Sequence, residues 1–271
     1  MGRLSSSTLG MRGALAHALA PFAIAIVAAC STDGSNTRAP RSPWLRTESV
    51  LLYPARDSLR PPRAVVFFFG NDIGFWQPHR ELAAALAADQ YAVVGFDMRP
   101  LLRSLPEREP ARDSAFATRV EKIIETSRHE MDGDTVPLVI AGHSLGAEVA
   151  IWTAAHVCLT GMKGVLAMSP GSRSHLRVSL ADIMNGPEPT GPESFSVAET
   201  IVAVPDPVRI AIIRGMRDDY ARADSALLAA GGSRIRRFTV PFAGHSLKRL
   251  VTASFETKRA LEWILSDHRD R

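Results

Sequence analysis

Along most of the chain, short apolar runs alternate with longer segments in which apolar residues recur at helical spacing. The run 64–69 contains only Ala, Val and Phe and is closed by a glycine, which is typical of a strand buried on both faces. In the segment 113–129, Phe116, Val120 and Ile123 fall on one stripe, which predicts an amphipathic helix. The pattern therefore alternates strand and helix.

The same reasoning extends over the rest of the chain. Strands are expected at 50–53, 64–69, 91–96, 137–142, 163–168, 208–213 and 234–242. Helices are expected at 77–88, 113–129, 145–159, 220–230 and 255–265. Such alternation predicts an α/β fold with a mostly parallel, twisted sheet of about seven strands and helices on both faces. The segment 172–205 is rich in Pro, Gly and Ser and predicts a small lid-like insertion, with a short strand at 176–180.

Composition agrees with a globular domain. Hydrophobic residues make up 46% and charged residues 22%, which excludes a mainly disordered, collagen-like or coiled-coil protein. The formal net charge of +4 includes Arg3 and Arg12, and the basic residues form no long run, so nothing indicates a nucleic-acid partner. Two cysteines are too few for a disulfide framework.

The beginning of the chain has the pattern of an export signal. Arg3 and Arg12 precede an apolar stretch at 14–29, which is shorter than the roughly 20 residues of a membrane-spanning helix. The stretch ends in Val-Ala-Ala-Cys, which resembles the lipobox of bacterial lipoproteins, and Cys30 would be the lipidated residue. An ordinary secretory signal with a chance cysteine is the alternative.

These features predict how the chain is divided. We expect a lipoprotein signal peptide at 1–29, a polar tether at 30–46 and one domain at 47–268 that includes the insertion. Lipid on Cys30 would hold the protein on a membrane of the bacterial cell envelope, facing the periplasm. Ser31 after the cysteine resembles the lipoproteins that are sent on to the outer membrane.

The strongest chemical signal is Gly-His-Ser-Leu-Gly at 142–146, between a predicted strand and a predicted helix. It matches the G-x-S-x-G nucleophile elbow, in which a strained turn presents the serine, here Ser144. The glycines leave room for neighbouring backbone. The N–H of Leu145 is expected to stabilise the negative charge that develops on a substrate oxygen. The alternative is a retained but inactive turn.

A serine nucleophile needs a base and an acid that orients the base. In chains with such an elbow, the nucleophile, the acid and the base follow one another in the order Ser, acid, His. Asp218 comes just after the predicted strand at 208–213 and is preferred as the acid over Asp219, which would cap the next helix. His245 lies on a glycine-containing loop after the last predicted strand and is the expected base.

The loop after the strand 64–69 reads Gly-Asn-Asp-Ile-Gly, and the backbone N–H of Asn71 is the candidate second oxyanion donor. Asp72 beside it and Glu148, one helical turn after Ser144, are candidates for attracting an ammonium group. A turn residue and a solvated helix residue are the alternatives for these two acids. No Cys-x-x-Cys or His-x-x-x-His spacing occurs, so neither a metal nor a cofactor is expected.

From about residue 50 to residue 265 the chain resembles the α/β-hydrolases. Within them it resembles the bacterial VirJ/AcvB-like virulence-associated group, on the strength of Gly-Asn-Asp-Ile-Gly-Phe-Trp at 70–76, Val-Val-Gly-Phe-Asp at 93–97 and Glu148. The group resemblance implies exposure to the periplasm and, for some members, hydrolysis of aminoacylated phospholipid.

Together these observations predict a lipid-anchored serine hydrolase that cleaves a carboxylic ester of a small molecule or a lipid. An aminoacyl ester of phosphatidylglycerol is the substrate that the group resemblance implies. Two alternatives stay open at this point. One is a non-catalytic binding or assembly lipoprotein on a hydrolase scaffold, and the other is a peptidase or thioesterase that uses the same triad.

Overall fold

The computed structural model describes residues 37–184, 186–246 and 253–266. The predicted signal peptide at 1–29 and the predicted lipidation site Cys30 lie outside these residues. Within the described part of the chain, every helix is too short or too polar to span a bilayer.

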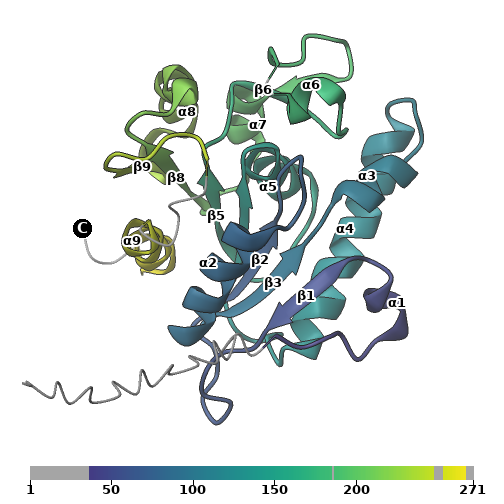
Figure 1. The fold of residues 1–271 in the computed structure, drawn as a ribbon, viewed down its shortest axis with the longest axis vertical. Helices are drawn as coiled ribbons and strands as arrows, with labels where there is room; N and C mark the ends of the chain where they lie inside the picture. Colours follow the sequence, from purple (N-terminus) through teal and green to yellow (C-terminus); the bar gives the residue numbers. More distant parts are fainter. Residues whose placement is uncertain (1–36, 185, 247–252, 267–271) are drawn as a thin grey trace, which may run out of the picture. The chain divides into compact units, whose positions relative to one another are not determined.

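A single seven-stranded sheet forms the centre of the domain (Figure 1), in the order β1-β3-β2-β4-β5-β8-β9. Its strands are β1 (Val50–Tyr53), β2 (Val65–Phe69), β3 (Ala92–Phe96), β4 (Leu138–His143), β5 (Met162–Met168), β8 (Arg209–Gly215) and β9 (Ile235–Val240). Strand β1 pairs with β3 in antiparallel register, and the other strand pairs are parallel. The predicted mostly parallel α/β sheet is therefore confirmed.

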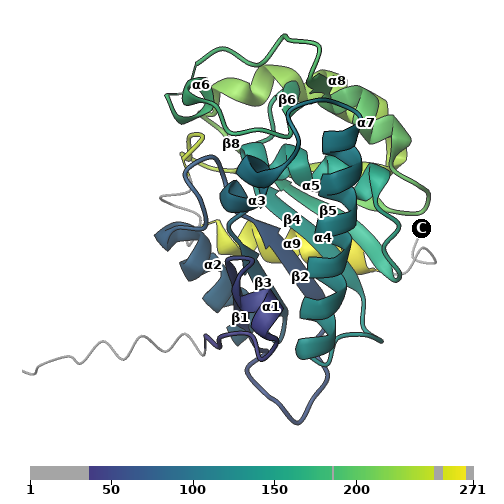
Figure 2. The same cartoon turned by 90° about the vertical axis from the view of Figure 1, so that its right-hand side faces the viewer.

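Helices cover both faces of the sheet (Figure 2), which explains why β2, β3 and β4 are buried along their whole length. Alternation along β2 places Phe67 in the core with α4 (Ala111–Glu130) and α5 (Leu145–His156). The next residue, Phe68, belongs to the opposite core with α2 (Gln77–Ala88) and α9 (Ser254–Leu265). Outside the insertion that follows β5, the other helices described are α1 (Pro43–Arg46), α3 (Arg99–Ser104), α8 (Asp224–Gly231) and the short 3-10 turns η1 (Asp219–Ala223) and η2 (Gly232–Arg234).

The insertion after β5 contains two short strands and two helices: β6 (Arg173–His175), α6 (Leu180–Ile183), β7 (Ser194–Ser196) and α7 (Val197–Ala203). The strand predicted at 176–180 is wrong. The strand ends at His175, and Ser179 instead starts α6 by accepting a hydrogen bond from the N–H of Asp182. Helix α7 packs on α5, so α5 is buried nearly all round and shows no polar face.

The described part of the predicted tether, residues 37–46, packs against the domain. Arg38 donates its backbone N–H to the carbonyl of Leu52 at 2.8 Å, and Leu45 is fully buried. The carboxylate of Glu130 accepts the backbone N–H groups of both Arg41 and Ser42 at 2.6 Å. The packed part of the chain therefore begins ahead of residue 47, because these backbone groups find partners on β1 and α4.

Candidate active site

Ser144 lies on a sharp turn between β4 and α5. Its backbone angles, φ 53° and ψ −126°, are strained for a residue with a side chain. The turn needs a glycine on each side, since a Cβ on Gly142 would lie 1.9 Å from the carbonyl oxygen of Gly146. A Cβ on Gly146 would lie 2.2 Å from the carbonyl oxygen of Gly70, at the end of β2. The motif therefore adopts the strand-turn-helix geometry of a nucleophile elbow.

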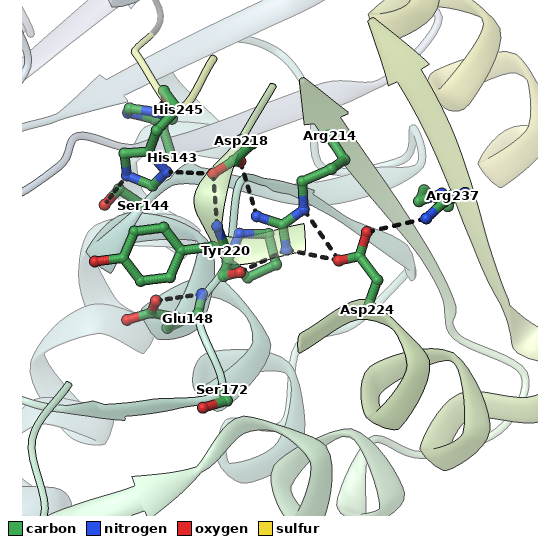
Figure 3. Close-up of polar contacts among 12 residues, drawn as sticks. His143, Ser144, Glu148, Ser172, Arg214, Asp218, Tyr220, Asp224, Arg237 and His245 are labelled. Atoms are coloured by element: carbon green, nitrogen blue, oxygen red, sulfur yellow. Dashed lines mark hydrogen bonds and ion pairs between the residues drawn. The ribbon is translucent and has the colours of Figure 1, made fainter. Parts of the chain in front are cut away.

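The structure brings Ser144, His245 and Asp218 together at the carboxyl end of the sheet, although they lie far apart in the sequence (Figure 3). The Nε2 atom of His245 is 3.0 Å from the Oγ of Ser144, and its Nδ1 atom is 3.2 Å from the Oδ1 of Asp218. Because a carboxylate only accepts hydrogen bonds, Nδ1 carries the proton and Nε2 is left to accept the serine hydroxyl.

Of the two neighbouring acids, Asp218 is the one beside His245. Its side chain is fully buried and also accepts the N–H of Tyr220 at 3.1 Å, so Asp218 itself caps the turn η1. Asp219 is exposed and lines the cavity above the serine. The capping role that the sequence suggested for Asp219 is therefore filled by its neighbour.

Asp218 stays ionised in spite of its burial. Burial by itself would raise its pKa, but hydrogen bonds from His245 and Arg214, and the charges of both, outweigh that effect and hold the pKa of Asp218 well below its usual range. A buried carboxylate that stays ionised at neutral pH is suited to stabilising an imidazolium ion on His245.

The two predicted oxyanion donors both lie at the site. Leu145 is the first residue of α5, so its N–H has no carbonyl to bind within the helix. Asn71 follows β2 and lies in a turn that is closed by the N–H of Gly74 on the Asn71 carbonyl, at 2.9 Å. Asn71 lines a cavity that also reaches Ser144, and Leu145 lines an adjoining one.

The larger of these cavities has a volume of about 700 Å³ and opens above Ser144. Ile73, Trp76 and Ile183 contribute apolar surface to it. The adjoining cavity is small, about 50 Å³. Its lining includes the carboxyl groups of Asp72, Glu148, Asp182 and Glu188, with Arg173 as its one guanidinium group among the described residues. The insertion supplies part of both linings, so the insertion shapes the space where a substrate meets the serine.

Glu148 differs from the solvated helix residue that its sequence position allowed. Its side chain is buried, and its Oε1 accepts the N–H of Gly171 at 2.7 Å. Burial raises the pKa of Glu148 to about 8. Burial also raises the pKa of Asp72, which lines both cavities. The two acids therefore face the same space beside Ser144.

Comparisons of sequence find no matching family model and no matching curated protein, but the fold is shared by many solved structures. A dienelactone hydrolase of Anabaena variabilis superposes with a TM-score of 0.56 at 16% identity, over 80% of this chain and 90% of that one. A carboxyl esterase of Bacillus coagulans superposes with a TM-score of 0.54 at 13% sequence identity, over 80% of this chain and 94% of that one. A monoglyceride lipase of Saccharomyces cerevisiae superposes with a TM-score of 0.57 at 13% sequence identity, over 81% of this chain and 92% of that one. The chain has the α/β-hydrolase fold.

The fold that the resemblance to the α/β-hydrolases implies is thereby confirmed. These structures do not bear on the finer resemblance to the VirJ/AcvB-like group, which stays a prediction. No group of three or more His, Cys, Asp or Glu side chains that would hold a metal ion is found in the described ranges.

Two residues at this site were not singled out from the sequence. His143 is buried, and its Nε2 lies 3.0 Å from the backbone carbonyl of His245, which makes this nitrogen the donor. Burial lowers the pKa of His143 well below its ordinary value, so the ring is neutral. Tyr220 contacts the His245 ring, with a centroid distance of 4.7 Å. The available signal was a histidine inside the elbow motif itself.

Proposed function

We propose that this chain is a serine hydrolase that cleaves carboxylic esters. The observation that carries the proposal is the unbroken path of hydrogen bonds from Asp218 through His245 to Ser144, at 3.2 and 3.0 Å, ending in a cavity. The serine is on a strained elbow and its base is oriented by a buried carboxylate, as nucleophilic catalysis requires.

The geometry supports a two-stage reaction. In the first stage the Oγ of Ser144 attacks the ester carbonyl carbon while its proton passes to Nε2 of His245. The N–H groups of Asn71 and Leu145 are proposed to bind the resulting oxyanion. When the tetrahedral intermediate collapses, the bond between carbon and the alcohol oxygen breaks, and that oxygen takes the proton from Nε2.

The second stage regenerates the enzyme. Water attacks the acyl-enzyme carbonyl and gives its proton to Nε2 of His245. The bond to the Oγ of Ser144 then breaks, the serine takes the proton back, and the acid is released. In both stages the ionised Asp218 stabilises the transient imidazolium ion.

We further propose that the acyl part of the substrate carries an ammonium group, as in an aminoacyl ester of phosphatidylglycerol. In such an ester the amino group is separated from the carbonyl carbon by a single carbon, so it must lie close to Ser144 when the ester reacts. Asp72 and Glu148 line the small cavity that Ser144 also lines. A bound cation favours the ionised form of each carboxyl group and so lowers its pKa.

The substrate proposal predicts selective loss of one activity. Extracts that contain lysyl- and alanyl-phosphatidylglycerol should lose these lipids with the wild-type protein and keep them with Ser144→Ala. Glu148→Gln should raise KM for the aminoacyl lipids about tenfold, since one charged contact is worth roughly 1–2 kcal/mol. KM for the neutral p-nitrophenyl acetate should stay unchanged. Cleavage of p-nitrophenyl acetate with untouched aminoacyl lipids would refute the substrate proposal and leave a general esterase.

The location of the protein is a separate proposal: a lipid on Cys30 anchors the chain to the envelope on the periplasmic side. The support is the lipobox-like tetrapeptide after an apolar stretch. Cells grown with labelled palmitate should yield labelled wild-type protein and unlabelled Cys30→Ser. Equal labelling of the two proteins, or none in either, would contradict lipidation of Cys30.

A further inference from the structure

A buried arginine lies directly behind the catalytic acid. Arg214 is near the end of β8, four residues before Asp218, and only 1% of it is exposed. Its Nη1 donates to the Oδ2 of Asp218 at 2.9 Å. Its Nε and Nη2 donate to the Oδ1 of Asp224 at 3.0 and 2.7 Å, and Nη2 also donates to the carbonyl of Pro170 at 2.7 Å (Figure 3).

These contacts determine how Asp218 is oriented. Its Oδ1 is taken by His245 and by the N–H of Tyr220, and its Oδ2 by Arg214. The guanidinium group is itself held by Asp224 from α8 and by backbone after β5, so it cannot follow a rotation of the Asp218 carboxylate. The arginine therefore fixes the plane of the carboxylate that faces His245.

The positive charge of Arg214 lies between the negative charges of Asp218 and Asp224. Arg214 alone would offset the negative charge of Asp218 and weaken its effect on His245. Asp224, 2% exposed, offsets the arginine in turn, so one net negative charge remains among these three buried groups. Arg237 reaches the far oxygen of Asp224 at 3.4 Å, but its side chain is 47% exposed and screened by solvent.

We propose that Arg214 and Asp224 are positioning residues of the triad. Arg214 locks the carboxylate plane of Asp218, and Asp224 preserves the negative charge that this carboxylate presents to His245. The inference rests on the proposed serine hydrolase function and deepens it, because it assigns roles to two residues that touch neither the substrate nor the reacting atoms.

Other charged or titratable groups also face His245. His143 contacts it from β4, Tyr220 contacts it from η1, and the charge of Asp72 acts on it from the loop after β2. None of these groups bonds Arg214 in the structure, and all of them remain in variants of Arg214 or Asp224. A change in the pH profile of such variants is therefore assigned to the charges of Arg214 and Asp224.

The test compares two variants that shift the pH profile in opposite directions. Arg214→Gln removes a positive charge, so the acid limb of kcat/KM for p-nitrophenyl acetate should move to higher pH. Asp224→Asn keeps an oxygen acceptor for Arg214 but removes a negative charge, so the limb should move to lower pH. Each shift should be about half a unit to one unit. Arg214→Gln should also lower kcat about 10- to 100-fold, since the carboxylate is no longer held.

Arg209→Gln is the matched control. Arg209 is also a buried arginine of β8, and its side chain bonds the carbonyl of Ser266 at 2.9 Å, away from the triad. The Arg209→Gln variant should have a lower melting temperature but an acid limb of kcat/KM at the wild-type pH. If Arg214→Gln does not fold, the acid limb of Asp224→Asn is the test of the inference. Acid limbs at the wild-type pH in folded Arg214→Gln and Asp224→Asn would overturn the inference. Full activity of Ser144→Ala would instead overturn the underlying hydrolase function.

Discussion

Replacement of Ser144 by alanine is expected to lower kcat for p-nitrophenyl acetate by about 10⁴- to 10⁶-fold while the protein stays folded. The reason is that the Oγ of Ser144 is the hydroxyl oxygen placed 3.0 Å from the Nε2 atom of His245. A residual rate about 10³-fold above the reaction in water should remain, because the oxyanion donors survive. His245→Ala should have a similar effect, since the serine is a poor nucleophile without its base.

The double variant separates a triad from two independent contributions. Because Ser144 and His245 act in one proton transfer, Ser144→Ala combined with His245→Ala should be no slower than the slower single variant. Steady-state rates with matched melting temperatures check this. Additive losses, or a folded Ser144→Ala with the wild-type rate, would contradict the nucleophile assignment.

The second large effect is expected at the acid, where adjacent residues provide a matched pair. Asp218→Asn should lower kcat about 10⁴-fold, because an amide no longer holds His245 in the tautomer with a proton on Nδ1. Asp219→Asn should leave kcat within about threefold, since its side chain is exposed and surface changes usually have small effects. If Asp219→Asn is the inactive variant, the acid is misassigned and the rest of the triad stands.

The pH profile gives a further check on the acid. The pKa of Asp218 is held well below its usual range, so this carboxylate is ionised at any pH at which the enzyme is assayed. The fall in kcat/KM toward low pH should therefore not reflect protonation of Asp218. The wild-type kcat/KM for p-nitrophenyl acetate should fall along a single acid limb with the slope expected for one proton. A limb of two protons would show that a second group, such as Glu148, must also be ionised.

Much of the fold could be predicted because its main elements repeat a simple pattern. The helix expected at 77–88 has those bounds in the structure, and the strand expected at 163–168 begins one residue earlier. The insertion was harder, because its strands and helix α6 have three or four residues each. Elements that short contain little more than one hydrophobic period, and capping by Ser179 decided where α6 begins.

The candidate triad was accessible from the sequence for a different reason. Chain order and position after a strand indicate Ser144, His245 and one of the two neighbouring acids, with Asp218 preferred over Asp219, without any knowledge of distances. The contacts that hold Asp218 in place could not be predicted, because Arg214 and Asp224 come together only in the folded chain. One signal was present in the chain: an arginine ending the apolar run Ile-Ala-Ile-Ile next to a glycine turn. A charged side chain at a buried strand position needs an oppositely charged or hydrogen-bonding partner.

Labelling with a fluorophosphonate probe tests the proposed hydrolase function most directly, since the probe reacts only with a serine whose base and oxyanion donors are in place. We predict one adduct per chain, located by mass spectrometry on the peptide that contains Ser144, with loss of labelling in His245→Ala. An unlabelled, folded wild-type protein, or an adduct on a different serine, would contradict the assignment of Ser144 as the nucleophile.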